Sequence, residues 1–252
     1  MADHRVLLET LSSAALGACI DIAGDEAHHL TRVKRLEAGA PIELLDGRGL
    51  RASAIIERTT KTRGGEWLVS ARIEGLTREA PISPRVEVWA SSPKGDRLSS
   101  MIDGLSQVGA AAWAPLHTTR TIVDPRDHKL ERLVRITAEA AKQSGRAWTL
   151  EIAKGGSLAV ALDTTDTLVV ADASGPDFTG ESMGPRVRLF IGPEGGFTPQ
   201  ELEQARSRGA RLLRFGPHTM RIETAAVVAA AMLVHHQVAA VSSPRTSTGA
   251  PA

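Results

Sequence analysis

Residues 189–198 read Leu-Phe-Ile-Gly-Pro-Glu-Gly-Gly-Phe-Thr, an apolar strand that enters a glycine-rich turn and then a helix start. Thr198 is a good N-cap, Pro199 suits the first helical position, and Glu201 completes a capping box. Glycines let a ligand approach the backbone closely, and a helix N-terminus presents free N–H groups. The stretch therefore predicts a ligand cradle at the carboxyl end of a strand. It matches neither a Walker A loop nor the dinucleotide pattern, and an ordinary strand–helix turn has the same local features.

A second stretch repeats this arrangement. Residues 215–225 read Phe-Gly-Pro-His-Thr-Met-Arg-Ile-Glu-Thr-Ala, so a strand again ends in a glycine and a helix follows. Taken alone, the segment also fits a solvated loop in which Glu223 complements the helix dipole. The segment is informative about function only in combination with the first one.

Strand-like and helical segments alternate around these two stretches. The expected strands are residues 86–90, 112–115, 168–171, 186–191 and 211–215, and the expected helices are residues 96–108, 129–144, 199–209 and 222–240. Continuous apolar strands of this kind suit a parallel sheet that is covered on both faces. The pattern predicts an α/β domain over residues 84–241, and the Ser, Pro, Thr and Gly content of residues 242–252 predicts a disordered tail.

The N-terminal part has a different character. Short β-like runs at residues 5–8, 41–45, 52–56 and 67–73 are separated by glycine-containing turn signals, with one short helix expected at residues 28–36. This order predicts a small β-barrel over residues 1–78. Residues 79–85 contain two prolines and are typical of a linker.

The composition of the chain limits which partners and cofactors we expect it to bind. The formal net charge is +1, so any nucleic-acid binding must come from local clusters of basic residues. No apolar run approaches the roughly 18 residues of a membrane span, and no signal-peptide pattern begins the chain, so we expect a cytoplasmic protein without a membrane contact. Cys19 is the single cysteine, which excludes an internal disulfide and argues against a zinc site; we expect no metal.

Taken together, the two glycine-rich segments identify a resemblance. Gly-Pro-Glu-Gly-Gly-Phe at residues 192–197 and Gly-Pro-x-x-x-Arg-x-Glu-Thr-Ala at residues 216–225 resemble the ribosomal RNA small subunit methyltransferase E family. Residues 28–36 are similar to the N-terminal signature of that family, and residues 139–146 are similar to its central helix. The resemblance spans residues 28 to about 235, nearly the whole chain.

The resemblance implies a SPOUT methyltransferase, with a PUA-like β-barrel followed by a trefoil-knotted α/β domain. It implies methylation of N3 of a uridine in the 16S rRNA of the small ribosomal subunit, S-adenosylmethionine (SAM) as cofactor, and a homodimer. The cofactor-binding residues that it implies are Val170, Ala171, Ile191, Gly192, Pro193, Gly195, Gly196, Phe215, Gly216, Met220, Arg221, Glu223, Thr224 and Ala225.

The expected chemistry singles out catalytic and RNA-binding residues. Uridine N3 carries a proton, so the site must remove it or stabilise the anion. We expect Arg221 to stabilise the negative charge, and the two possible bases are Glu194 and Glu223. Arg221 is the first catalytic candidate and Glu194 the second. The expected RNA-binding residues come from the basic stretch of the first domain and from the end of the central helix: His29, Arg32, Arg35, Gln143 and Arg146.

The sequence departs from the family pattern at three positions. Gly104 and Gln107 stand where the family usually has Lys and Glu, and His218 stands where it has Arg. Two alternatives therefore stay open: a SPOUT methyltransferase that acts on another RNA position, and a non-catalytic RNA-binding factor for ribosome assembly. Nearly intact SAM loops argue against the second.

Overall fold

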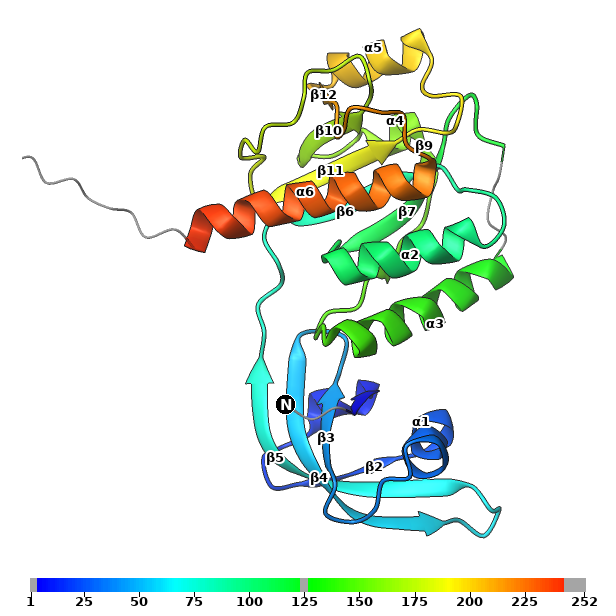
Figure 1. The fold of residues 1–252 in the computed structure, drawn as a ribbon, viewed down its shortest axis with the longest axis vertical. Coiled ribbons are helices and arrows are strands. Elements are labelled where there is room, and N and C mark those ends of the chain that lie inside the picture. The colour runs from blue at the N-terminus through cyan, green and yellow to red at the C-terminus, as the bar shows by residue number, and fades with distance from the viewer. Residues whose placement is uncertain (1–3, 123–126, 243–252) are drawn as a thin grey trace, which may run out of the picture. The chain divides into compact units, whose positions relative to one another are not determined.

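The structure is a computed structural model that describes residues 4–122 and 127–242, and its chain forms two compact units. Unit 1 comprises Met1–Pro81 and Thr137–Thr149, and unit 2 comprises Ile82–Ile136 and Leu150–Ala252 (Figure 1). The sequence predicts one domain boundary, at residues 79–85, with the whole helix at residues 129–144 in the second domain. The structure instead groups the second half of this helix with unit 1.

Unit 1 is built on a five-stranded sheet with the order β1-β3-β4-β5-β2. Its strands are β1 (Arg5–Leu7), β2 (Cys19–Ile22), β3 (Pro41–Leu45), β4 (Leu50–Lys61) and β5 (Trp67–Arg78). β1 pairs with β3 in parallel and the other neighbours are antiparallel. Buried residues alternate along β4, where Ala52, Ala54 and Ile56 face the core. The short edge strand β2 was not expected from the sequence.

The helical turns of unit 1 differ from the expected helix at residues 28–36. A 3₁₀ turn, η1 (Glu9–Ser13), precedes them, and α1 (Gly24–His28) continues directly into η2 (His29–Val33). Helical geometry ends because Arg35 takes φ +54°, a left-handed conformation that lets the Leu36 N–H donate to the Leu30 carbonyl at 3.0 Å. Glycine is the usual residue at such a position.

Long-range hydrogen bonds attach the end of α3 (Asp127–Ser144) to the strands of unit 1. Arg5 donates to the carbonyl of Lys142 at 2.9 Å, and Arg51 donates to the carbonyl of Gly145 at 2.7 Å. Both arginines also pair with Glu43, at 2.7 and 2.5 Å. Burial acts to raise the pKa of Glu43, but the two guanidinium groups outweigh it and lower the pKa.

Unit 2 contains a seven-stranded sheet in which every pairing is parallel. The main path runs β12-β10-β11-β6-β7-β8, and β9 pairs with β7. The strands are β6 (Arg85–Ala90), β7 (Ala112–His117), β8 (Glu151–Ile152), β9 (Gly156–Ser157), β10 (Thr167–Ala171), β11 (Arg186–Ile191) and β12 (Arg211–Leu213). The expected α/β class is confirmed.

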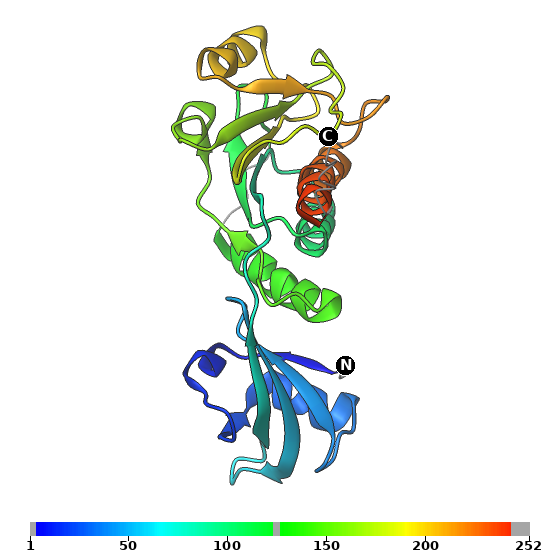
Figure 2. The same cartoon turned by 90° about the vertical axis from the view of Figure 1, so that its left-hand side faces the viewer.

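The continuous apolar strands arise because both faces of this sheet are covered. Leu189 and Ile191 of β11 pack with α2 (Arg97–Val108) and α6 (Ile222–Ser242), whereas Phe190 packs on the other face with α4 (Leu158–Ala161) and α5 (Pro199–Ser207). Figure 2 shows these two helical layers on opposite sides of the sheet. Alternate side chains of one strand thus enter different cores.

Gly104, one of the departures from the family pattern, has a packing role. A Cβ at this position of α2 would lie 2.8 Å from Cγ2 of Val227 in α6, so only glycine allows the two helices to approach this closely. Gln107, the neighbouring departure, donates to Asp103 at 2.8 Å on the exposed side of α2.

None of the helices in residues 4–122 and 127–242 combines the length and the apolar character of a membrane-spanning segment. Ser242, at the start of the expected disordered tail, is the last residue of α6, and the rest of that segment lies outside the described residues.

The predicted capping box at Thr198 and Glu201 is confirmed, and it connects the start of α5 with the end of β7. The Glu201 carboxylate accepts from the N–H of Thr198 at 2.8 Å, and from the N–H and hydroxyl of Thr119 at 2.8 and 3.0 Å. Because Glu201→Ala leaves these donors without an acceptor, we expect it to lower the free energy of unfolding by about 2 kcal/mol. Chemical denaturation at neutral pH measures this, and the exposed Glu203→Ala serves as the matched control.

The contribution of Glu201 should depend on pH in a defined direction. Burial acts to raise its pKa, but the hydrogen bonds from Thr198 and Thr119 outweigh burial and lower the pKa below the ordinary value of 4.5. A lowered folded-state pKa gives a stabilisation that is present above pH 4.5 and lost as the pH falls through the folded-state pKa. The stability difference between wild type and Glu201→Ala should therefore shrink in acid, and a constant difference would contradict this assignment.

Candidate functional site

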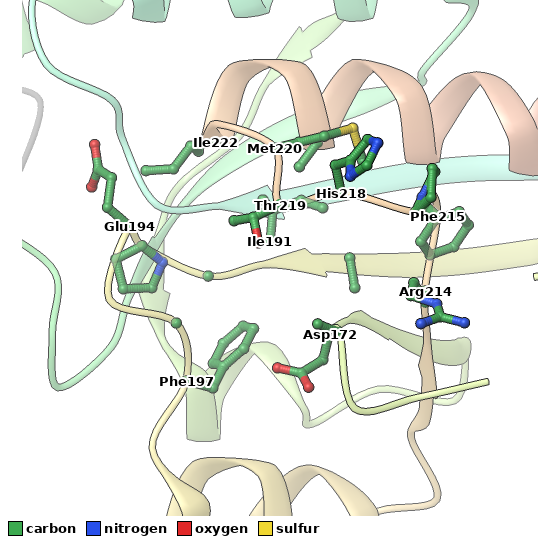
Figure 3. Close-up of a pocket in the computed structure, with 18 residues that line it drawn as sticks. Asp172, Ile191, Glu194, Phe197, Arg214, Phe215, His218, Thr219, Met220 and Ile222 are labelled. Atoms are coloured by element: carbon green, nitrogen blue, oxygen red, sulfur yellow. The ribbon is translucent and has the colours of Figure 1, made fainter. Parts of the chain in front are cut away.

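The loops that follow β10, β11 and β12 meet at one edge of the unit 2 sheet. These three strands are parallel neighbours, so their carboxyl ends lie side by side. Together the loops and the first turns of α6 enclose a cavity of about 300 Å³ (Figure 3). It is lined by Ala171, Asp172, Ala173, Ile191, Gly192, Pro193, Glu194, Gly196, Phe197, Arg214, Phe215, Gly216, Pro217, His218, Thr219, Met220, Ile222 and Ala225. Its position is the one at which open α/β sheets bind ligands.

The glycine-rich loop after β11 forms one wall of this cavity. A Cβ on Gly192 would lie 3.0 Å from the ring of Phe197, a close contact from which the ring would have to shift slightly. Gly196 has φ +67° and its N–H donates to the carbonyl of Pro193 at 2.8 Å, which closes the turn. Arg120, from the loop after β7, donates to the carbonyl of Gly195 on the outside of the turn.

The other two loops are bound to each other. Arg214 pairs with Asp177 at 2.6 and 3.0 Å, and the N–H of Phe178 donates to the carbonyl of Arg214 at 2.9 Å. The guanidinium of Arg214 lowers the pKa of Asp177. The rings of Phe178 and Phe215 also contact each other, with centroids 5.3 Å apart. These contacts fix the wall opposite the glycine-rich loop before any ligand binds.

Glu194 lies at one end of the cavity (Figure 3), and two further charged side chains, Arg97 and Glu223, are near it. Arg97, the first residue of α2, lies 4.0 Å from Glu194 and 3.9 Å from Glu223. Within the described structure, Oε2 of Glu223 is buried and has no hydrogen-bond partner. This oxygen therefore has unused capacity to accept a hydrogen bond, although Glu223 is not itself part of the cavity lining.

Comparison with known proteins identifies the family. Residues 79–234 match the model of the RNA methyltransferase domain, and residues 22–68 match that of the RNA methyltransferase PUA domain. The chain belongs to the RNA methyltransferase family. The expected α/β fold with a PUA-like first domain is confirmed, while the trefoil knot stays a prediction.

Individual relatives agree with this assignment. This chain is 29% identical over 226 residues to the ribosomal RNA small subunit methyltransferase E of Synechocystis. The aligned region covers 86% of this chain and 73% of the relative. The chain is 28% identical to the Bacillus subtilis protein of the same name, over 82% of this chain and 86% of the relative. The solved structure of that methyltransferase from Neisseria gonorrhoeae, bound to S-adenosyl methionine, is 25% identical, has a TM-score of 0.78, and covers 90% of this chain and 95% of the other.

The cavity of the RNA methyltransferase includes most of the residues expected to bind a cofactor. Those that line it are Ala171, Ile191, Gly192, Pro193, Gly196, Phe215, Gly216, Met220 and Ala225, together with the expected base Glu194. Five expected residues, Val170, Gly195, Arg221, Glu223 and Thr224, are not part of the lining. Val170 is a core residue, and Arg221 is exposed at the turn before α6.

Sequence reasoning missed several residues of the site. Asp172, Phe197, Arg214, His218 and Thr219 also line the cavity. Adjacency was the available signal, because each lies within a few residues of an expected cofactor residue at the end of a strand. No local signal marked Arg97 or Arg120, since only the tertiary fold brings the loops after β6 and β7 to the glycine-rich turn.

The expected RNA-binding residues all lie in unit 1. His29 and Gln143 line one cavity there, and Arg32 and Arg35 are exposed on the neighbouring turn. Arg146 is half-buried, and burial lowers the pKa of its guanidinium to about 10. Within the described chain, no group of three His, Cys, Asp or Glu side chains could hold a metal ion.

Proposed function

We propose that this RNA methyltransferase transfers the methyl group of SAM to N3 of a uridine in 16S rRNA. The observation that carries the proposal is the cavity formed by the two glycine-rich loops, in a chain that matches the RNA methyltransferase domain and is similar to a SAM-bound relative. The names of the relatives support the small-subunit RNA as substrate. The family resemblance of the two loop sequences supports N3 as the acceptor atom.

The residues of the cavity fit SAM in size and chemistry. About 300 Å³ is at the lower end of the range for small-molecule sites. Ile191, Phe215 and Ala225 provide apolar walls suited to an adenine ring, and the backbone of residues 192–196 can approach the ligand because Gly192 carries no side chain. When bound, SAM supplies an electrophilic methyl group on a sulfonium centre.

The remaining task of the protein is to make the acceptor nitrogen nucleophilic. A neutral uridine N3 is a poor nucleophile, so its proton must be removed as the new bond forms. Glu194 lines the cavity, and we assign it the role of base, with the buried oxygen of Glu223 as the second candidate acceptor for the proton. Arg97 lies close to both carboxylates and holds them at this end of the cavity.

Arg221 is assigned to the developing anion. Loss of the N3 proton spreads negative charge over the two flanking uracil oxygens, which a guanidinium can contact through its fork of donors. Arg221 follows Met220, a cavity residue, and its own side chain is exposed. It is therefore accessible to an RNA substrate without being part of the cofactor cavity.

A homodimer in the cytoplasm also remains part of the proposal. Helix α6 is apolar on nearly all sides, and Val227, Val228 and Ala231 are only half-buried in the single chain. A second copy of the chain could cover this surface.

Nucleoside mapping of 16S rRNA tests the function. RNA incubated with protein and SAM should gain one N3-methyluridine, detected by mass spectrometry, and reverse transcription should stop there because the base-pairing proton is lost. A different methylated nucleoside would favour action on another RNA position. RNA binding without SAM binding or methylation would favour the non-catalytic assembly factor and refute the enzyme assignment.

A further inference from the structure

Unit 1 contains a cavity of about 310 Å³ that the proposed chemistry does not use. Three segments far apart in the sequence form it: the start of β1, the turn η2 with its exit, and the end of α3. It is lined by His4, Arg5, His29, Leu30, Lys34, Glu139, Lys142 and Gln143. The two family-like stretches at residues 28–36 and 139–146 therefore meet at one site, although more than a hundred residues separate them.

The floor of this cavity is fixed by ion pairs. Lys142 bonds to Glu26 at 2.5 Å and to Glu139 at 2.8 Å, and Arg5 is held by Glu43 at 2.7 Å. Burial acts to lower the pKa of Lys142, but the two carboxylates outweigh it and raise the pKa. Since carboxylates already compensate these cations, the cavity is not simply an anion site.

The other walls offer mixed recognition chemistry. Leu30 lies behind the wall with almost no exposed surface, whereas His29 and Gln143 are exposed and present an imidazole and an amide. Nδ1 of His4 is buried and has no hydrogen-bond partner within the described residues. A ring for stacking, an amide and an unpaired ring nitrogen together match one nucleotide better than a free phosphate.

Arg35 has an unusual backbone conformation next to this cavity. Its φ is +54°, and it directly follows Lys34, which lines the cavity. Glycine would adopt this conformation without strain, so an arginine at this position costs stability. Its side chain is exposed. This arrangement indicates a role outside the fold, of the kind that a phosphate contact would satisfy.

We propose that this cavity binds one unstacked nucleotide of a single-stranded RNA segment, and that Arg35 contacts a phosphate flanking it. The inference rests on the proposed function for the identity of RNA as substrate, and it adds the place where unit 1 holds that RNA. Single-stranded bases are recognised by stacking and by hydrogen bonds to their edges, while phosphate contacts set the register.

Arg35→Gly separates recognition from stability. Glycine should keep or raise the melting temperature because it relieves the left-handed strain. It should also weaken binding to transcribed 16S rRNA in a filter assay, and lower the slope of log Kd against log salt by about 0.7 to 1 for one lost phosphate contact. A variant that is more stable and binds RNA as tightly as wild type would overturn the role of Arg35.

The cavity itself is tested by the double variant His29→Ala, Gln143→Ala. Both side chains are exposed, so folding should be retained. We expect the Kd and the KM for 16S rRNA to rise about tenfold, with kcat at saturating RNA and SAM affinity unchanged. Arg63→Ala, an exposed basic residue on the turn between β4 and β5, is the matched control and should leave both values near wild type.

The outcomes distinguish this inference from the proposed function. Wild type that binds and methylates 16S rRNA, together with an unaffected double variant, would overturn the nucleotide site and leave the enzyme assignment intact. Wild type that binds RNA but neither binds SAM nor methylates would refute the enzyme assignment, while the filter assay would still test the cavity. Wild type without any affinity for 16S rRNA would overturn the nucleotide site.

Discussion

Gly192→Val should weaken SAM binding by about a hundredfold, equivalent to roughly 3 kcal/mol. The first atom of the new side chain would lie 3.0 Å from the Phe197 ring, and both residues line the cavity. The two methyl groups of valine would add to this contact, and we expect the cavity wall to change shape where the ligand binds. Isothermal titration calorimetry with SAM measures the change.

Gly216→Ala is the matched control for this effect. It lies in the second glycine-rich loop of the same cavity, but its Cβ would lie 3.6 Å from Cε of Met220, an ordinary contact with a flexible side chain. We expect its affinity for SAM to remain within a few-fold of wild type. Equal affinities for Gly192→Val and wild type, with unchanged melting temperatures, would show that SAM does not use this cavity.

Arg221→Ala should lower kcat by about a hundredfold and leave the Kd for SAM nearly unchanged. The reason is that a guanidinium stabilises the deprotonated uracil more than the neutral base, so its contribution appears mainly in the transition state. Arg221→Lys should recover only part of the activity, because an ammonium group lacks the fork of donors. Single-turnover methylation of 16S rRNA at saturating SAM gives the rate.

Arg97→Ala provides the contrasting result. Arg97, rather than Arg221, lies beside Glu223 and Glu194, so it is the arginine that should hold this end of the site. We expect the removal of the Arg97 side chain to weaken SAM binding and lower the melting temperature.

If saturating SAM restored the turnover of Arg221→Ala, Arg221 would have only a structural role, and its catalytic assignment would have to be withdrawn.

Local patterns in the sequence were sufficient for most elements of unit 2. The apolar runs at residues 168–171 and 186–191 became β10 and β11, and Thr198 with Glu201 forms the predicted capping box. These features depend on residues close together in the chain, which is why sequence reasoning reaches them. The short elements β2, β8, β9 and α4 lacked such a pattern and were missed.

The site was predictable in part for the same reason. The glycine-rich loops that hold Gly192 and Gly216 are local motifs, and the structure brings both to one cavity. The sequence did not show that Arg221 would lie outside the lining, or that Glu223 would face Arg97. Those outcomes depend on which strand ends become neighbours in the sheet.

The sequence by itself determined the alternation of strands and helices, the two glycine-rich turns and, through them, the family. Only the tertiary structure decided that the end of α3 belongs to unit 1, that Gly104 lets α2 approach α6, and that His29 and Gln143 share a cavity. The physical reason is the range of the interactions. Propensity, capping and turn geometry act over a few residues, whereas side-chain packing and ion pairs join segments whose separation along the chain carries no local signal.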